Sequence, residues 1–275
     1  MEISASKLHG LGNAYVVIED LARKLEKRYP EIAKGISNMS FGIGSDGILV
    51  VNRGKLARYR MRVFNPDGGE AEMSGNGARI FAIYLYDRKM ISRKAEIEVG
   101  GRKGGKLISV AVEGRNHVTV DFGKGMIIGS KSVVAKGKRF SGTHVDVGNP
   151  HFIIFDGSDD AARVHAKEYG NAIERHAAFK PNGVNVEFAH VRNRHNITLH
   201  VWERGTGITL ACGSGACATA LAARKKGLIA DKVSIRLLGG TLTVLLDDDR
   251  IVLKGPVGHI FSGKLYLDEI LEGMV

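Results

Sequence analysis

Two segments of this 275-residue sequence follow the same plan, and this repeat constrains the fold more than any other feature. Residues 63–79 and 201–220 each place an apolar run of strand length before a glycine-rich turn that opens an apolar helical stretch. Ser74 and Cys212 hold the same place in the two copies, 138 residues apart. Because this spacing is close to half the chain length, the repeat indicates two similar halves rather than one large domain.

The periodicity of apolar residues predicts the same order of elements in both halves. Alternating patterns indicate strands, 3.6-residue patterns indicate helices, and glycine pairs mark the turns between them. The resulting helices are expected from Asp20 to a break at Pro30 and over residues 31–37, 78–86, 159–174 and 215–226. We therefore expect an α+β fold of two similar α/β halves related by pseudo-twofold symmetry, each a mixed or antiparallel sheet around a central helix.

The repeat also predicts the boundaries of the two halves. The first half is expected to comprise residues 1–123 together with a returning segment at 262–275, and the second half residues 124–261. The starts of the two central helices are expected to face a common cleft, which is where a small ligand usually binds.

Composition excludes several classes of function. No apolar run reaches the length of about 18 residues that a membrane helix needs, and the N-terminus lacks a secretion signal, so we expect a cytoplasmic protein without membrane contact. The net charge of +11 would suit nucleic acid, but the basic clusters are scattered and have few aromatic residues among them, which argues against that partner. The oligomeric state stays open, a homodimer included.

The second copy of the repeat carries the groups with acid–base chemistry. Cys212 stands at the start of a helix, where a thiol has a lowered pKa, and it is a candidate base or nucleophile. Glu203 is a candidate partner for its proton, and Arg204 offers a planar fork for a carboxylate. Taken singly, Glu203 and Arg204 would more often be a surface pair. Cys217 is expected to be a small buried residue.

Further candidates lie at loops. Glycine-rich helix starts expose backbone N–H groups that bind anions, although a single such turn more often only allows close packing. Asn13, Asn65, Asn149 and Asn185 flank strands, where they either form turns or bind a ligand with ammonium and carboxylate groups. His151 is a candidate proton carrier. The spacing of cysteines and histidines indicates no metal site.

Several motifs together resemble the diaminopimelate epimerase family over nearly the whole chain. They are residues 9–13, 42–46, 64–68, 75–79, 148–151, 203–205 and 211–217. The resemblance implies an amino-acid epimerase of the lysine and cell-wall pathway that works without a cofactor and interconverts LL- and meso-diaminopimelate. Two cysteines on opposite faces of the α-carbon would exchange its proton, one as thiolate and the other as thiol.

The resemblance also implies residue roles. Cys212 matches the second cysteine with Glu203 as its proton partner, and His151 would serve the position of the first. The substrate-binding positions it implies are Asn13, Asn65, Asn149, Asn185 and Arg204, with the amides around Gly75, Asn76, Gly213 and Ser214 holding the reacting carboxylate.

Ser74 departs from the family pattern, which requires cysteine at this position. A hydroxyl is a much weaker acid than a thiol, whose ordinary pKa is about 8.5, so we expect impaired proton transfer. Either an engineered change or a natural variant with altered activity explains the serine. A related epimerase or dehydratase of another amino acid, and a ligand- or nucleic-acid-binding protein without activity, are the alternatives.

Overall fold

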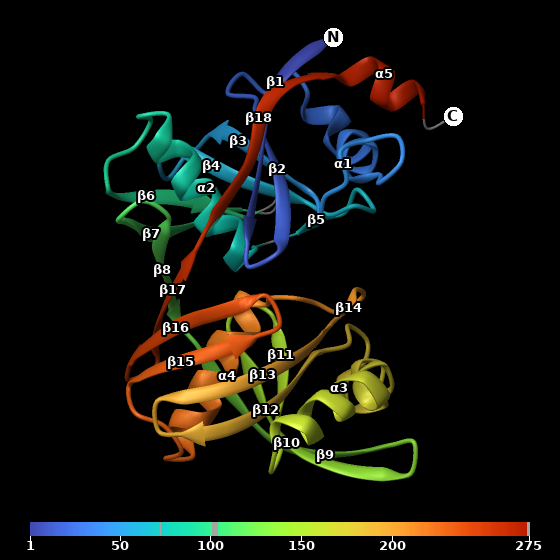
Figure 1. The fold of residues 1–275 in the computed structure, drawn as a ribbon, viewed down its shortest axis with the longest axis vertical. Coiled ribbons are helices and arrows are strands. Elements are labelled where there is room, and N and C mark those ends of the chain that lie inside the picture. The colour runs from blue at the N-terminus through green and yellow to red at the C-terminus, as the bar shows by residue number, and fades with distance from the viewer. Residues whose placement is uncertain (72, 101–103, 274–275) are drawn as a thin grey trace. The chain divides into compact units, whose positions relative to one another are not determined.

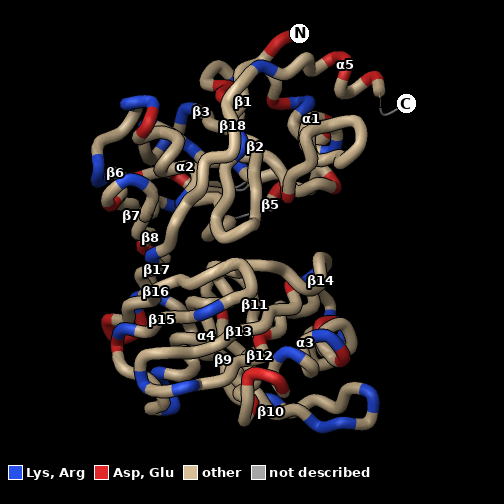
Figure 2. The backbone as a smooth tube through the Cα atoms, in the orientation of Figure 1, with Lys and Arg blue, Asp and Glu red and all other residues tan. Residues whose placement is uncertain are grey.

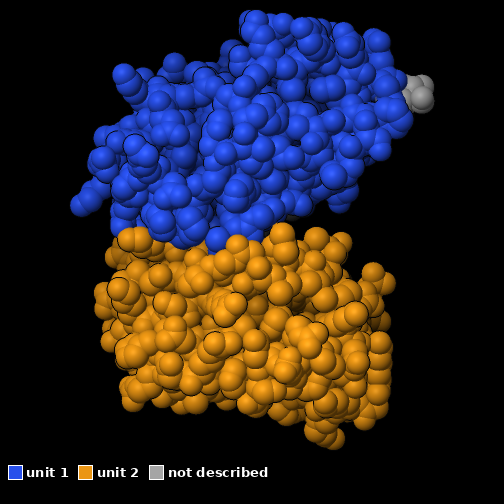
Figure 3. Space-filling view, in the orientation of Figure 1, with its two compact units in different colours: residues 1–120, 255–275 blue, residues 121–254 orange. Residues whose placement is uncertain are grey.

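The computed structural model describes residues 1–71, 73–100 and 104–273, and it has the α+β fold that the sequence predicts. The chain divides into two compact units, residues 1–120 with 255–275 and residues 121–254 (Figure 3). The returning segment therefore begins at Gly255, seven residues before the expected start at 262. The expected start falls inside a strand, because Ser262 pairs with Ser6 in the first unit.

The first unit is a mixed sheet with a helix packed against its middle. Its strands are ordered β18, β1, β2, β3, β4, β6, β7, β8, and only the pairs β2–β3 and β4–β6 are parallel. Its elements are β1 (Glu2–Gly10), β2 (Asn13–Glu19), η1 (Glu26–Arg28), α1 (Tyr29–Ser37), β3 (Ile48–Arg53), β4 (Tyr59–Phe64), β5 (Glu70–Ala71), α2 (Gly75–Asp87), β6 (Lys94–Val99), β7 (Lys106–Glu113), β8 (His117–Lys124), β18 (Gly258–Tyr266) and α5 (Leu267–Glu272).

The second unit repeats this topology strand for strand. Its order is β9, β10, β11, β12, β13, β15, β16, β17, with β11–β12 and β13–β15 as the parallel pairs. Its elements are β9 (Met126–Ala135), β10 (Lys138–Asp146), β11 (Pro150–Phe155), α3 (Asp159–Glu174), η2 (Ala177–Phe179), β12 (Asn185–Asn193), β13 (Asn196–Glu203), β14 (Gly207–Ile208), α4 (Gly213–Lys225), β15 (Lys232–Leu237), β16 (Gly240–Asp247) and β17 (Arg250–Pro256). In the first unit β18, from the end of the chain, takes the place that β9 has here (Figure 1).

The central helices of both units are buried, as their apolar sequences predict. Every residue of α2 from Gly75 to Leu85 is buried, and so are nearly all residues of α4 up to Ala223. α2 packs against β1, β2, β3, β4 and β7, and α4 packs against β10, β11, β12 and β16. Because each helix is enclosed by its own sheet, its N-terminus is held in a fixed position beside the strand ends.

The segment after Asp20 differs from the prediction. A helix beginning at Asp20 and broken at Pro30 was expected, but residues 20–25 form turns and α1 begins at Tyr29, with Pro30 in its first turn. The carboxylate of Asp20 accepts hydrogen bonds from the N–H groups of Lys24 and Leu25 and from the hydroxyl of Tyr29. Proline is favoured in a first helical turn because its missing N–H has no partner there anyway.

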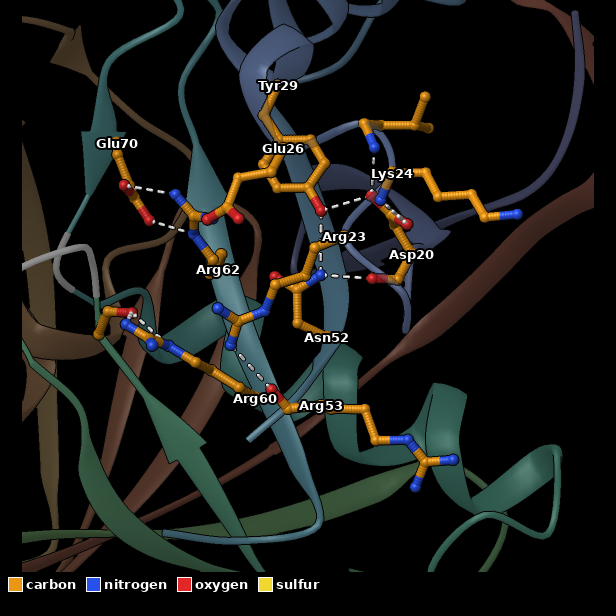
Figure 4. A network of polar contacts seen from close by, with 12 residues as sticks. Asp20, Arg23, Lys24, Glu26, Tyr29, Asn52, Arg53, Arg60, Arg62 and Glu70 are labelled. Carbon is orange, nitrogen blue, oxygen red and sulfur yellow. Dashed lines mark hydrogen bonds and ion pairs between the residues drawn. The ribbon is translucent and has the colours of Figure 1, made fainter. Parts of the chain in front are cut away.

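A buried polar network fixes α1 to the sheet (Figure 4). Asn52 on β3 donates to the hydroxyl of Tyr29, and Arg62 on β4 donates to both carboxylate oxygens of Glu70 and to Glu26. The Arg62 guanidinium also lies over the Tyr29 ring. Burial raises the pKa of Tyr29, so its hydroxyl stays a hydrogen-bond donor.

Figure 2 draws lysine and arginine positions on several elements of both units. None of the helices in the described parts of the chain combines the length and the apolar character needed to cross a membrane.

Candidate active site

Ser74 and Cys212 occupy equivalent positions in the two units, as the sequence repeat predicts. Each is the N-cap residue of the buried central helix, with φ and ψ of −136° and 122° at Ser74 and −125° and 109° at Cys212. Ser74 Oγ accepts the N–H of Gly77 at 3.0 Å, and Cys212 Sγ accepts the N–H of Gly215 at 3.3 Å. The two side chains therefore have the same relation to a helix N-terminus and differ in one atom.

The surroundings of Cys212 overturn the expectation of a lowered pKa. The residue is only 4% exposed, and burial raises the pKa of its thiol well above the ordinary value. The negative charges of Glu203 and Glu187 raise it further, while hydrogen bonds from Ser214 and the N–H of Gly215 lower it. Since the raising effects outweigh the helix N-terminus, Cys212 is a protonated thiol near neutral pH in this structure.

Glu203 lies beside the Cys212 thiol, as expected for a proton partner. It ends β13, accepts a hydrogen bond from Thr209 Oγ1 at 2.6 Å and hydrogen bonds to Cys212. Burial raises the pKa of the Glu203 carboxyl, and the Thr209 hydroxyl and the nearby His151 lower it in part. The raised pKa makes the Glu203 carboxyl a better proton acceptor than an ordinary carboxylate, and it lies beside the thiol.

His151 is completely buried and fixed by oxygens on both sides of its ring. Its Nδ1 lies 2.6 Å from Glu187 Oε1, and its Nε2 lies 2.9 Å from Asn149 Oδ1. Glu187 is also fully buried, and a Cβ added at Gly215 would lie 2.7 Å from its Oε1. The carboxylate of Glu187 therefore lies directly beneath the N-terminus of α4.

Sequence reasoning missed Glu187, although the sequence contains a signal for it. It stands in the otherwise apolar run of residues 184–189, apart from Asn185, on a strand that is buried on both faces. An acidic residue is almost never fully buried unless it is paired. Such a position predicts a buried partner, which the structure identifies as His151.

The remaining candidates of the second unit lie around this group. Asn149 Nδ2 donates to Ser214 Oγ at 3.5 Å, and Gly213 and Ser214 form the first turn of α4. Asn185 is tied to backbone atoms, since it accepts the N–H of Arg204 at 3.0 Å and donates to the carbonyl of Pro150 at 2.9 Å. Arg204 is exposed, and its guanidinium donates to the carbonyl of Asn182.

The first unit brings together Ser74, Gly75, Asn76 and Asn13. Asn13 lies at the start of β2, and its Oδ1 accepts a hydrogen bond from Asn76 Nδ2 at 3.0 Å. The turn before it, at Leu11 and Gly12, has positive φ angles of 57° and 91°, which suit the tight connection between β1 and β2. Asn65 directly follows β4, as Glu203 ends β13.

Two more residues of the first unit join this group without having been predicted. The hydroxyl of Tyr15 lies 3.3 Å from Ser74 Oγ, and Arg79 donates to Asn76 Oδ1 at 2.7 Å. Tyr15 could have been found by analogy, because it stands two residues after Asn13 as His151 stands two residues after Asn149.

Among the described residues no group of three or more His, Cys, Asp or Glu side chains is placed to hold a metal ion.

Comparison with known proteins covers nearly the whole chain. The sequence model described as diaminopimelate epimerase matches residues 5–128 and 143–260. A diaminopimelate epimerase of Moorella thermoacetica is 34% identical over 278 residues, which cover 95% of this chain and 99% of that protein. One of Bacteroides thetaiotaomicron is 38% identical over 275 residues and covers 96% and 98%.

Solved structures share the fold at low sequence identity. A phenazine biosynthesis protein of the PhzF family from Bacillus anthracis has a TM-score of 0.75 at 14% identity and covers 96% of this chain and 99% of its own. A hydroxyproline epimerase from Agrobacterium vitis has a TM-score of 0.71 at 12% identity, with coverage of 96% and 91%. These structures support the fold of the chain and nothing beyond it.

Proposed function

The chain belongs to the diaminopimelate epimerase family, a family of isomerases. On that premise we propose that it interconverts LL- and meso-diaminopimelate by removing the α-hydrogen from one face of the α-carbon and returning a proton to the other. The observation that supports this most directly is the equivalence of Ser74 and Cys212 as N-caps of two buried helices. In this proposal Cys212 serves one face of the α-carbon, and Ser74 serves the other.

Cys212 needs a change of its surroundings before it can act as a base, because its thiol is protonated near neutral pH. The α-ammonium group of a bound amino acid would supply the opposite charge that stabilises a thiolate, and Glu203 would take the thiol proton. The thiolate then accepts the α-proton as the Cα–H bond breaks. The electron pair of that bond moves into the carboxylate held by N–H groups at the starts of the helices, around Gly75, Asn76, Gly213 and Ser214.

Ser74 makes the second half of the reaction slow. To complete inversion, its hydroxyl would have to give a proton to the opposite face of the carbanion, and its alkoxide is far more basic than a thiolate. His151 is the proposed partner for the proton of this position. Cys212 can instead return a solvent-derived proton to the face from which it took one, so exchange without inversion is expected to outrun epimerisation.

Substrate binding in this proposal uses amides and one arginine. Asn13, Asn65, Asn149, Asn185 and Arg204 would contact the ammonium and carboxylate groups of diaminopimelate. The support is that Asn13 begins β2 and Asn149 directly precedes the equivalent strand β11, each beside a capped helix.

The test compares two rates in deuterated water. Incorporation of deuterium at the α-carbon is followed by NMR, and inversion is followed by separating LL- from meso-diaminopimelate. We expect substrate of one configuration to be labelled much faster than it is inverted, and Cys212→Ser to abolish the labelling. Equal labelling of both configurations contradicts the one-thiol account, and loss of water from another amino acid would replace the proposed reaction with a dehydration.

A further inference from the structure

Arg79 is among the largest fully buried side chains of the described residues, and it contacts the substrate-binding candidates of the first unit. It stands in the second turn of α2 and points back to the start of the helix. One guanidinium nitrogen donates to the carbonyl of Gly75 at 3.2 Å, and the other donates to Asn76 Oδ1 at 2.7 Å. The guanidinium is therefore bound to the same two residues whose amides are proposed to hold a carboxylate.

These hydrogen bonds have a fixed direction, because a guanidinium only donates. Asn76 must turn its Oδ1 toward Arg79, which leaves its Nδ2 facing Asn13. Asn13 must in turn accept with its Oδ1, which leaves its own Nδ2 on the other side of the amide. Within the described part of the chain no acceptor takes a hydrogen bond from Asn13 Nδ2.

We propose that Arg79 is a positioning residue that fixes Asn13 as a hydrogen-bond donor toward a carboxylate of the substrate. This inference rests on the proposed function and adds a residue to it. An asparagine alone presents either its oxygen or its nitrogen to a ligand, and only the nitrogen binds an anion. The guanidinium of Arg79 removes that choice through Asn76, because it can only donate.

The backbone is built to allow this contact. A Cβ added at Gly10 would lie 2.9 Å from the guanidinium and 3.3 Å from Asn76 Cβ, so the end of β1 passes directly over both residues. The second unit has no arginine at the equivalent position of its central helix, because Cys217 of α4 corresponds to Arg79 of α2. The amide of Asn149 has the opposite orientation to that of Asn13: its Nδ2 faces the helix start at Ser214, and its Oδ1 faces His151.

The test is a double-mutant cycle on the full chain, read as the Kd for diaminopimelate by calorimetry. Asn13→Asp keeps the acceptor for Asn76 but turns a carboxylate oxygen toward the ligand, and we expect Kd to rise roughly a hundredfold. Arg79→Met removes the donor at similar length, and we expect a rise of roughly tenfold because Asn76 and Asn13 can then reverse. In the Asn13→Asp background, Arg79→Met should add nothing.

Additive effects of the two changes would overturn the inference, because Arg79 would then act by its charge or by packing rather than through Asn13. An unchanged Kd in Arg79→Met would overturn it as well. Where Arg79→Met fails to fold, Asn76→Asp tests the same chain of bonds. It keeps an acceptor for Arg79 but loses the donor to Asn13, so we expect a similar loss of affinity with the melting temperature maintained, and an unchanged Kd would again overturn the inference.

Failure of the proposed function has a different signature. If the unmodified chain does not bind diaminopimelate, the substrate assignment is wrong, and the cycle has no starting value. If it binds and the cycle is additive, the substrate stands, and only the role of Arg79 is lost.

Discussion

The starts of α2 and α4 have the same backbone but differ in every neighbouring side chain that carries charge. The registers pair Val16 with Ile48 in the first unit and Phe152 with Val186 in the second, which makes these positions equivalent. A Cβ added at Gly77 would meet Leu49, and one added at Gly215 would meet Glu187. The corresponding pairs are Tyr15 and His151, Leu49 and Glu187, Asn65 and Glu203, and Arg79 and Cys217.

This comparison shows that the helix N-terminus does not decide the acidity of its cap. Both caps lie at the positive end of a buried helix, but Cys212 has two carboxylates beside it and a raised pKa. The first unit has a leucine and an amide at the equivalent places and a buried arginine in the second turn of its helix. The two helix starts therefore share a backbone but place opposite charges near their caps.

Ser74→Cys removes the difference between the caps and has the largest expected effect. A thiol at this position can give and take a proton near neutral pH, and a positioned acid–base group contributes roughly 10²–10⁴-fold in rate. We expect the rate of inversion of diaminopimelate to rise by about that factor while one-sided exchange changes little. Ser74→Ala is the control, and inversion as slow in Ser74→Cys as in Ser74→Ala would show that the second face is served by another group.

Leu49→Glu copies the buried carboxylate into the unit that has Tyr15 in the place of His151. Glu187 is paired with His151, whereas the equivalent of His151 in the first unit is Tyr15. An uncompensated buried charge costs about 3–5 kcal/mol, so we expect the free energy of unfolding to fall by that amount in denaturant titrations. Leu49→Gln is the neutral control and should cost less, and equal losses in both variants would show that shape rather than charge separates the two positions.

Glu203→Gln tests the cause of the raised pKa of Cys212. Removing the negative charge of Glu203, which raises this pKa more than Glu187 does, should lower it, and Glu187→Gln should lower it less. The shift of isotope-labelled Cys212 Cβ, followed by NMR across pH, measures it directly. The new thiol of Ser74→Cys should titrate at lower pH than Cys212, and the reverse order would show that burial alone sets both values.

The same shift predicts how stability depends on pH. The folded-state pKa of Cys212 lies above the unfolded value of about 8.5, so the unfolded chain loses its proton first as pH rises. The folded state then binds more protons, and stability must fall as pH rises from about 8.5 toward the folded-state pKa. Glu203→Gln should reduce this loss, which melting temperatures above and below pH 8.5 would reveal.

The sequence could predict the positions of the site but not their electrostatics. The offset of 138 residues between Ser74 and Cys212 was enough to predict two equivalent helix caps, because residue spacing determines position in a repeated fold. The pKa of Cys212 was predicted in the wrong direction, because burial raises it most and the negative charges of Glu203 and Glu187 raise it further. Burial depends on packing between distant parts of the chain, and Glu187 lies 25 residues away in sequence, so neither effect could be read from the residues around Cys212. Asp20 failed as a helix start for a local reason, because its carboxylate closes a turn with Lys24 and Leu25.

Gly215→Ala and Gly77→Ala give the smallest and most local test of the comparison. Alanine stabilises a helix by about 1 kcal/mol relative to glycine, and the two sites share one backbone. At Gly77 the new Cβ would lie 3.0 Å from Ser74 Cβ and 3.1 Å from the end of Leu49, and shifts of a few tenths of an ångström would relieve both contacts. At Gly215 it would meet Glu187 Oε1 at 2.7 Å, and this oxygen is held 2.6 Å from His151.

We therefore expect Gly77→Ala to change stability by less than about 1 kcal/mol and Gly215→Ala to cost about 1–3 kcal/mol, with a displaced NMR signal of the His151 ring. Equal costs and an unmoved His151 signal would mean that the Glu187 carboxylate is free to move, and the two helix starts would then differ in composition but not in rigidity.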